Sequence, residues 1–188
     1  MIKAVIFDCF GVLVEPSLEP FCDIYFPDDA KKRQRVKDLD KEASSGHISY
    51  GEFTTELARL AGISNNKAAE FLNNNPPNIA LLDYIKADLK PHYKIGFLSN
   101  ASDDWMNDLF TPEQQLLFDD VVLSFKYGIV KPDTAIFELA AKRLGVEPAD
   151  CLFVDDVEVY CQGSKAAGMQ ALIFHDFNSF REQFQAYK

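Results

Sequence analysis

The chain has 188 residues, of which 47% are hydrophobic, and its formal net charge at pH 7 is −10. This composition is that of a folded globular protein, long enough for one sizeable core or for a core with a small inserted module. The negative charge argues against nucleic acid as a partner, because binding to a phosphate backbone needs a basic surface.

No apolar stretch reaches the roughly 18 residues that a membrane span needs. The first residues, Met1-Ile2-Lys3, lead straight into an apolar run, and nothing there resembles a signal peptide. The four cysteines form no C-x-x-C pair and have no zinc-like spacing with the three histidines. We therefore expect a cytoplasmic protein with reduced thiols and no contact with a membrane.

The first predicted element is a buried strand over residues 4–7, which ends at Asp8. Ligand sites in open α/β sheets lie outside the carboxyl ends of the strands. A carboxylate placed there can act as a nucleophile or as a metal ligand. The strand is followed by Cys9, Phe10 and Gly11, and the identity of residue 10 decides how far the function can be predicted.

From about residue 16 to residue 84 the sequence predicts helices and no convincing strand. The clearest start signal is Ser49 followed by Glu52, which has the form of a capping box. Helical stretches are predicted over 30–43, from 49 to about 60, and over 66–72 and 79–89. We expect a small helical cap inserted beside Asp8, where it can act as a lid. The alternative is that these helices pack on one face of the sheet.

In the rest of the chain, short apolar runs alternate with helical segments. The runs cover 94–98, 121–124, 152–154 and 171–174, and the segments with helical spacing are 102–110, 133–144 and 157–168. Such alternation predicts an α/β fold with a doubly wound, mostly parallel sheet. The expected domains are a core of residues 1–15 and 85–188 and a cap of residues 16–84.

Polar side chains follow four of the predicted strands or lie shortly after them. They are Asp8, Ser99-Asn100, Lys131 and Asp155-Asp156. Each alone is explained by a helix cap, a turn or a surface charge. Parallel strands bring their carboxyl ends to one edge, so we expect all four sets to converge. Three carboxylates suit Mg²⁺, and a lysine with a hydroxyl suits an anion that the net charge would otherwise repel.

These motifs resemble the haloacid dehalogenase-like (HAD) superfamily of hydrolases, and the resemblance covers essentially the whole chain. They are, in order, Asp8-Cys9-Phe10-Gly11-Val12, Leu98-Ser99-Asn100, Lys131-Pro132-Asp133, Val154-Asp155-Asp156 and the segment 163–169. Residues 45–53 are similar to the small helical caps of sugar-phosphate phosphatases and of epoxide-hydrolase N-terminal domains in this superfamily.

The resemblance implies a Mg²⁺-dependent phosphatase of a small phosphorylated metabolite, working through an aspartyl-phosphate on Asp8. It also implies that Asp8, the Phe10 carbonyl and Asp156 hold Mg²⁺ and that Asp155 assists through water or hydrogen bonds. The resemblance further implies that Ser99 and Lys131 hold the phosphoryl group. Asn100 and the backbone of Gly11 would add hydrogen-bond donors.

One position departs from the pattern of the superfamily's phosphatases. They usually carry a second Asp two residues after the nucleophile, as acid and base, and this chain has Phe10. Three hypotheses follow: a slow phosphatase, a haloacid dehalogenase, or a relative that binds a phosphorylated ligand or a partner without catalysis. A slow phosphatase could take its acid from His47, Glu15 or Tyr50. Dehalogenases of the superfamily carry an aromatic residue, usually Tyr, at the position of Phe10, but they typically have Ser and Asn in place of Asp155-Asp156, so the acidic pair argues against this hypothesis. Neither the substrate nor the oligomeric state is readable from the sequence.

Overall fold

The computed structural model describes residues 1–188 and contains a single sheet of five parallel strands in the order β3-β2-β1-β4-β5. The strands are β1 Ala4–Phe7, β2 Lys94–Ser99, β3 Asp120–Leu123, β4 Cys151–Asp155 and β5 Gln170–Ile173. The chain builds the sheet outward from β1 on one side and then returns to its other side, so β1 is central. The register pairs Phe7 with both Phe97 and Val154, which brings the ends of these three strands level.

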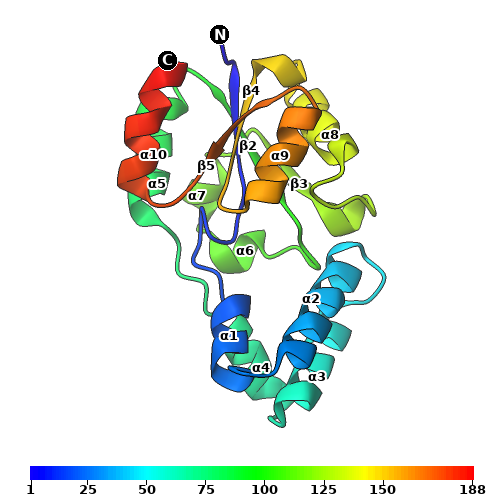
Figure 1. Ribbon diagram of the computed structural model, residues 1–188. Helices are drawn as coiled ribbons and strands as arrows, with labels where there is room; N and C mark the ends of the chain where they lie inside the picture. The colour runs from blue at the N-terminus through cyan, green and yellow to red at the C-terminus, as the bar shows by residue number, and fades with distance from the viewer.

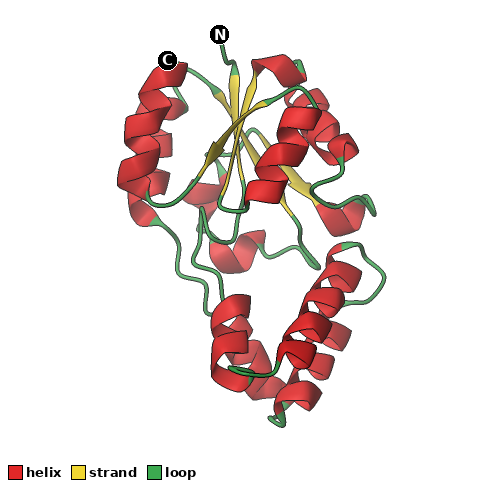
Figure 2. Ribbon diagram, in the orientation of Figure 1, coloured by secondary structure: helices red, strands yellow, loops and turns green.

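Helices cover both faces of the sheet (Figure 2), and β1 shows why. All four of its residues are buried, and alternate side chains enter different apolar clusters. Val5 and Phe7 belong to one cluster, whereas Ala4 and Ile6 belong to the other. The first face is covered by α5 Ile79–Tyr84, the π-helical turn Ile85–Leu89 and α10 Phe177–Phe184, and the second by α8 Thr134–Leu144 and α9 Glu158–Ala166. The doubly wound α/β class is confirmed.

Four helices form a separate lobe below the carboxyl ends of the strands (Figure 1). They are α1 Leu18–Tyr25, α2 Ala30–Ser44, α3 Tyr50–Ala61 and α4 Asn65–Leu72. This lobe, which we call the cap, has its own apolar cluster of 11 buried residues. The capping box predicted at Ser49 is present, and Gly62 ends α3 in the left-handed conformation.

Two connections fasten the cap to the sheet. The entering and leaving segments run side by side, with Glu15 N donating to Pro76 O at 3.0 Å and Asn78 N donating to Leu13 O at 2.8 Å. At the far end of α2, Ser124 Oγ donates to Ser44 O at 2.6 Å. Ser124 opens the 3-10 turn Ser124–Lys126 directly after β3, so the end of α2 is held against the edge of the sheet.

Residues 79–84 pack differently from the sequence-based expectation, which placed them in the cap. Leu81, Ile85 and Leu89 belong to the apolar cluster of the sheet that also contains Val5 and Phe7. This packing places α5 with the α/β part, whereas the sequence analysis set the boundary between residues 84 and 85. The amphipathic pattern of this helix was recognised, but the surface that it covers could not be inferred from its own residues.

The helix expected over 102–110 is shorter in the structure, where α6 spans Met106–Leu109. The preceding acidic residues bond to the local backbone instead: Asp104 N donates to Asp103 Oδ1 at 2.7 Å, and Met106 N donates to Asp104 Oδ1 at 3.4 Å. Asp side chains compete with helix formation in this way. The remaining short helical elements are α7 Pro112–Gln115, the turn Pro148–Asp150 and the turn Gln185–Tyr187.

The stretch 177–184, for which the sequence analysis named no helix, forms α10. Phe177, Phe180 and Phe184 recur at helical spacing and pack on the sheet cluster, and this periodicity was available in the sequence. None of the helices has both the length and the apolar character required to cross a membrane.

Candidate active site

A cleft of about 490 Å³ lies between the carboxyl ends of the strands and the cap. Asp8, Ser99, Lys131 and Asp156 line it from the sheet side. The backbone N–H of Asp8 donates to Val154 O at 2.9 Å, so the residue after β1 stays in register with the end of β4. The polar residues at the strand ends therefore meet at one edge, as the topology of a parallel sheet requires.

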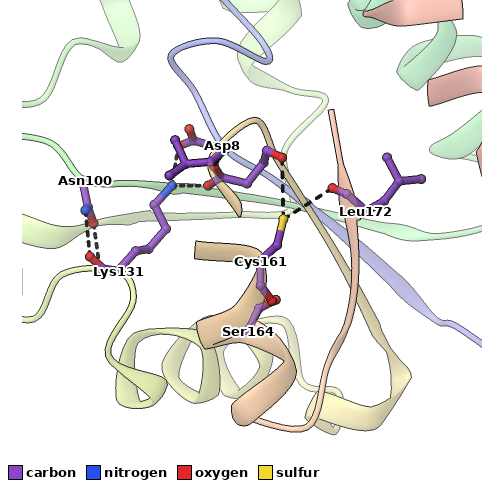
Figure 3. Close-up of polar contacts among 8 residues, drawn as sticks. Asp8, Asn100, Lys131, Cys161, Ser164 and Leu172 are labelled. Atoms are coloured by element: carbon purple, nitrogen blue, oxygen red, sulfur yellow. Dashed lines mark hydrogen bonds and ion pairs between the residues drawn. The ribbon is translucent and has the colours of Figure 1, made fainter. Parts of the chain in front are cut away.

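Lys131 joins the ends of β1 and β4 (Figure 3). Its Nζ lies 2.7 Å from Asp8 Oδ1 and 2.6 Å from Asp155 Oδ2. The Lys131 side chain is 1% exposed and that of Asp155 is 0% exposed, so these charges interact in a low-dielectric environment. Asp155 Oδ1 also accepts a hydrogen bond from Val157 N at 2.8 Å. Both oxygens of Asp155 are therefore engaged, and this carboxylate orients the lysine.

Asn100 holds the backbone of Lys131. Lys131 N donates to Asn100 Oδ1 at 2.8 Å, and Asn100 Nδ2 donates to Lys131 O at 3.1 Å (Figure 3). The sequence analysis expected Asn100 to be a donor to the substrate. In the structure its oxygen and one of its amide protons position the lysine, although the residue also lines the cleft.

One ammonium group, that of Lys131, faces the two buried carboxylates of Asp8 and Asp155. Burial raises the pKa of Asp8 to about 7, because it outweighs the favourable charge of Lys131. For Lys131, burial lowers the pKa, but the charges of Asp155 and Asp8 more than offset it and the pKa is raised. Lys131 therefore stays protonated, and the cluster keeps an excess of negative charge.

Three carboxylates at this edge fit a divalent cation. One oxygen from each of Asp8, Asp155 and Asp156 lies within 4.8 Å of the others. Asp156 is exposed to the cleft. Partial burial of its carboxyl group, followed by the charge of Asp155, raises the pKa of Asp156. Oxygen ligands of this kind are those that Mg²⁺ prefers.

Gly11 makes room for the carboxylate of Asp156. Its φ of +91° lies in the region that favours glycine, and a Cβ at this position would overlap the Asp156 carboxyl group. The loop after β1 can therefore approach Asp156 only with glycine at position 11.

The hydroxyl of Ser99 is buried and has no hydrogen-bond partner within the protein. Ser99 ends β2 and lines the cleft. Buried hydroxyl groups are normally satisfied, so an unpaired one at a cleft is a donor available to a ligand. This placement agrees with the anion-binding role expected for Ser99.

Phe10 supplies no acidic group and instead begins an aromatic row that leads to the cap. Its ring meets Trp105 edge-on with centroids 5.4 Å apart, and Trp105 meets Tyr50 of α3 at 5.3 Å. All three residues line the cleft.

The three residues considered from the sequence as proton donors to the leaving group are poorly placed for that role. His47 and Glu15 do not line the cleft. Tyr50 does, but its hydroxyl donates to Asn73 Oδ1 at 2.6 Å. Burial also raises the pKa of Tyr50 to about 12, which makes it a weak proton donor near neutral pH.

Asp40 of α2 is a cleft residue that the sequence analysis did not identify. Burial alone raises its pKa to about 6, and no hydrogen bond or opposite charge compensates. A sequence signal did exist: Asp40 follows Val36 by four residues and precedes Ser44 by four, which places a carboxylate on the buried face of the helix.

We expect Asp40→Asn to stabilise the protein near neutral pH. The folded protein binds the Asp40 proton more tightly than the unfolded chain does, so wild-type stability falls as pH rises from about 4 to about 6. Above pH 6, the substitution should raise the free energy of unfolding by about 1–2 kcal/mol, after allowance for the partial exposure of Asp40. This gain corresponds to a melting temperature higher by a few degrees. Thermal unfolding at about pH 4 should show no gain. Asp38→Asn, an exposed position on the same helix, is the control, and equal stability of wild type and Asp40→Asn at both pH values would contradict the prediction.

Fold and site together define an α/β enzyme with a carboxylate at the tip of its central strand. The chain belongs to the haloacid dehalogenase-like hydrolases, because the model of that family matches residues 2–168. The D-ribitol-5-phosphate phosphatase of Bacteroides thetaiotaomicron is 28% identical over 173 residues, covering 83% of this chain and 84% of the relative. The protein is thus a phosphatase-like hydrolase of this family.

Solved structures share the fold. A HAD family enzyme from Bacteroides thetaiotaomicron, in complex with magnesium and inorganic phosphate, has a TM-score of 0.75 and 22% identity, covering 96% of this chain and 99% of that chain. The L-2-haloacid dehalogenase from Xanthobacter autotrophicus, with chloropropionic acid covalently bound, has a TM-score of 0.66 and 19% identity. The match covers 99% of this chain and 83% of that chain. The fold is thus shared with a dehalogenase and with an enzyme solved with magnesium and phosphate, and fold alone does not determine the reaction.

Proposed function

We propose that this protein is a Mg²⁺-dependent phosphatase that acts on a small phosphorylated metabolite through an aspartyl-phosphate on Asp8. The observation that carries the proposal is the cluster around Asp8: a buried lysine at 2.7 Å, a third carboxylate on Asp156 and the unpaired hydroxyl of Ser99. The relative that acts on D-ribitol 5-phosphate supports a substrate of this size and chemistry.

In this mechanism an oxygen of Asp8 attacks the phosphorus, and the bond from phosphorus to the leaving oxygen breaks. Lys131 Nζ and Ser99 Oγ donate hydrogen bonds to the phosphoryl oxygens as negative charge develops on them. Asp155 and Asn100 keep Lys131 in place. Mg²⁺ bound by Asp8, Asp156 and the Phe10 carbonyl would neutralise part of the charge of the phosphoryl group. Water then attacks the phosphorus and releases Asp8.

The site favours this reaction over dehalogenation. The aromatic residue at position 10 is the feature shared with the dehalogenase hypothesis. The three clustered carboxylates favour a cation-assisted reaction, because attack on carbon without a metal has no use for the charge of Asp156. Release of halide from 2-chloropropionate without added metal would favour the dehalogenase instead.

The test is turnover of p-nitrophenyl phosphate by wild type and Asp8→Asn. Wild type should release p-nitrophenolate with Mg²⁺ and stop when EDTA removes the metal, and mass spectrometry of rapidly quenched protein should locate a phosphoryl group on Asp8. Asp8→Asn should turn over only at the background rate, since an amide is a poor nucleophile. Turnover of Asp8→Asn equal to wild type would refute the role of Asp8. Binding of phosphate with no turnover of any ester would favour a non-catalytic relative.

A further inference from the structure

The leaving group of the proposed reaction points toward the cap. In phosphoryl transfer the attacking and leaving oxygens lie roughly in line on opposite sides of phosphorus. Because Asp8 attacks from the sheet side, the leaving oxygen faces the helices across the cleft. It departs from most esters only if it receives a proton, and the phenyl ring of Phe10 has none to give.

We propose that Asp40 of the cap helix α2 is the general acid of this enzyme and protonates the leaving oxygen opposite Asp8. The inference rests on the phosphatase function proposed above. It assigns to the cap a catalytic role that Phe10, two residues after the nucleophile, cannot fill in this chain.

The position of α2 brings Asp40 to the reacting side of the cleft. The C-terminal end of the helix is held at the edge of the sheet, where Ser44 O accepts a hydrogen bond from Ser124 Oγ at 2.6 Å (Figure 1). The backbone of Gly46, just beyond the helix, packs against Phe125 O. Asp40 lies one turn before Ser44 on the same helix face, and it lines the same cleft as Asp8.

Asp40 and the nucleophile line one cleft together with Lys131 and Tyr160. Lys131 Nζ, which contacts Asp8, lies 4.8 Å from the centre of the Tyr160 ring. Burial is the main cause of the raised pKa of Tyr160; the charge of Lys131 opposes this shift, and the charge of Asp40 adds to it. A ligand seated on Lys131 therefore occupies the cleft that Asp40 lines.

Asp40 also has the right chemistry for this role. It has no ion-pair or hydrogen-bond partner, and burial raises its pKa to about 6, close to the pH at which general acids work best. Its proton moves to the leaving oxygen as the bond to phosphorus breaks. The carboxylate that results can accept a proton from the water that attacks phospho-Asp8, which restores the acid.

The other carboxylates that face the cleft from the cap and from α6 are less suited. Glu19 pairs with Arg33. Asp108 is exposed to solvent. Asp40 is the half-buried acid without a partner, and the titratable groups that line the cleft from the sheet side are Asp8, Lys131, Asp156 and Tyr160.

The experiment compares two substrates of similar shape, p-nitrophenyl phosphate and phenyl phosphate. Nitrophenolate leaves readily without a proton, whereas phenolate is a much poorer leaving group. We expect Asp40→Asn to lower kcat/KM for phenyl phosphate about 10²-fold and for p-nitrophenyl phosphate less than about threefold, because kcat/KM reports steps up to the departure of the leaving group. Asp40→Glu should recover part of the loss, and Asp38→Asn should behave as wild type.

An equal loss on both substrates would show a structural or binding role and overturn the proposal, and so would no loss on either. Because Asp40→Asn is expected to be at least as stable as wild type, a melting curve separates misfolding from catalysis. If wild type hydrolyses neither ester with Mg²⁺, both the phosphatase function and the role of Asp40 fail. If wild type is active and Asp8→Asn is inactive, but Asp40→Asn keeps wild-type rates, only the role of Asp40 fails.

Discussion

In an Asp40→Asn background, Phe10→Asp is expected to raise kcat/KM for phosphate esters with poor leaving groups by about 10²-fold. Position 10 lines the cleft two residues after Asp8, so an aspartate there places a second acid near the leaving oxygen. The backbone carbonyl of residue 10 is unchanged, and its proposed place in the metal site is kept. The change removes the edge-on contact of Phe10 with Trp105, at a cost of about 0.5–1.5 kcal/mol beyond the lost burial.

The matched control is Phe10→Asn, which has the size of aspartate but no acidic proton. In the Asp40→Asn background, steady-state rates with phenyl phosphate should rise for Phe10→Asp and not for Phe10→Asn. The gain should be smaller when Asp40 is present, because two residues that supply the same proton are not additive. A folded protein with Phe10→Asp and Asp40→Asn that is no faster than Asp40→Asn alone would contradict the prediction.

Lys131→Met is expected to destabilise the protein by about 3–5 kcal/mol, the usual cost of removing one partner from a buried ion pair. Without Lys131, the carboxylates of Asp8 and Asp155 are left buried without a counter-charge. Methionine keeps much of the length and volume of the lysine side chain. The loss of stability is therefore due to the removed charge and not to a cavity. The melting temperature should fall by about 10 °C, and turnover should fall to the background rate.

The control for this substitution is Lys126→Met, which removes an exposed lysine paired with Asp104 at 2.6 Å. Exposed pairs contribute about 0–1 kcal/mol, so its melting temperature should stay close to that of wild type. The Lys131→Met deficit should shrink at about pH 4, because the orphaned carboxylates are then protonated. A deficit below about 1 kcal/mol at neutral pH would show that the lysine does not hold the two carboxylates together.

Much of the α/β part follows from local patterns. Five apolar runs marked the five strands, since a parallel strand covered on both faces must be apolar along its whole length. The polar residues after those runs could be located for the same reason: the strand ends where burial ends. The start of α3 was also readable, because a capping box depends on residues only three positions apart.

Other features depended on contacts between distant segments. Asn100 lines the cleft, but its hold on Lys131, 31 residues further along the chain, could not be inferred from the sequence. Residues 102–105 had the spacing of a helix, but the side chains of Asp103 and Asp104 accept hydrogen bonds from nearby backbone N–H groups instead. Periodicity reports which face of a helix is buried and does not report what buries it.

The sequence by itself determined the five strands and most of the helices between them, the strand ends that carry Asp8, Ser99 and Asp155, and the absence of an acid at Phe10. Only the tertiary structure decided that α5 covers the sheet, that the C-terminal end of α2 is held at its edge and that Asp40 therefore faces the cleft. The physical reason is one of range. Backbone propensity and capping act within a few residues, whereas the direction in which a cap helix turns its carboxylate depends on a surface some 80 residues away, where Ser124 meets Ser44.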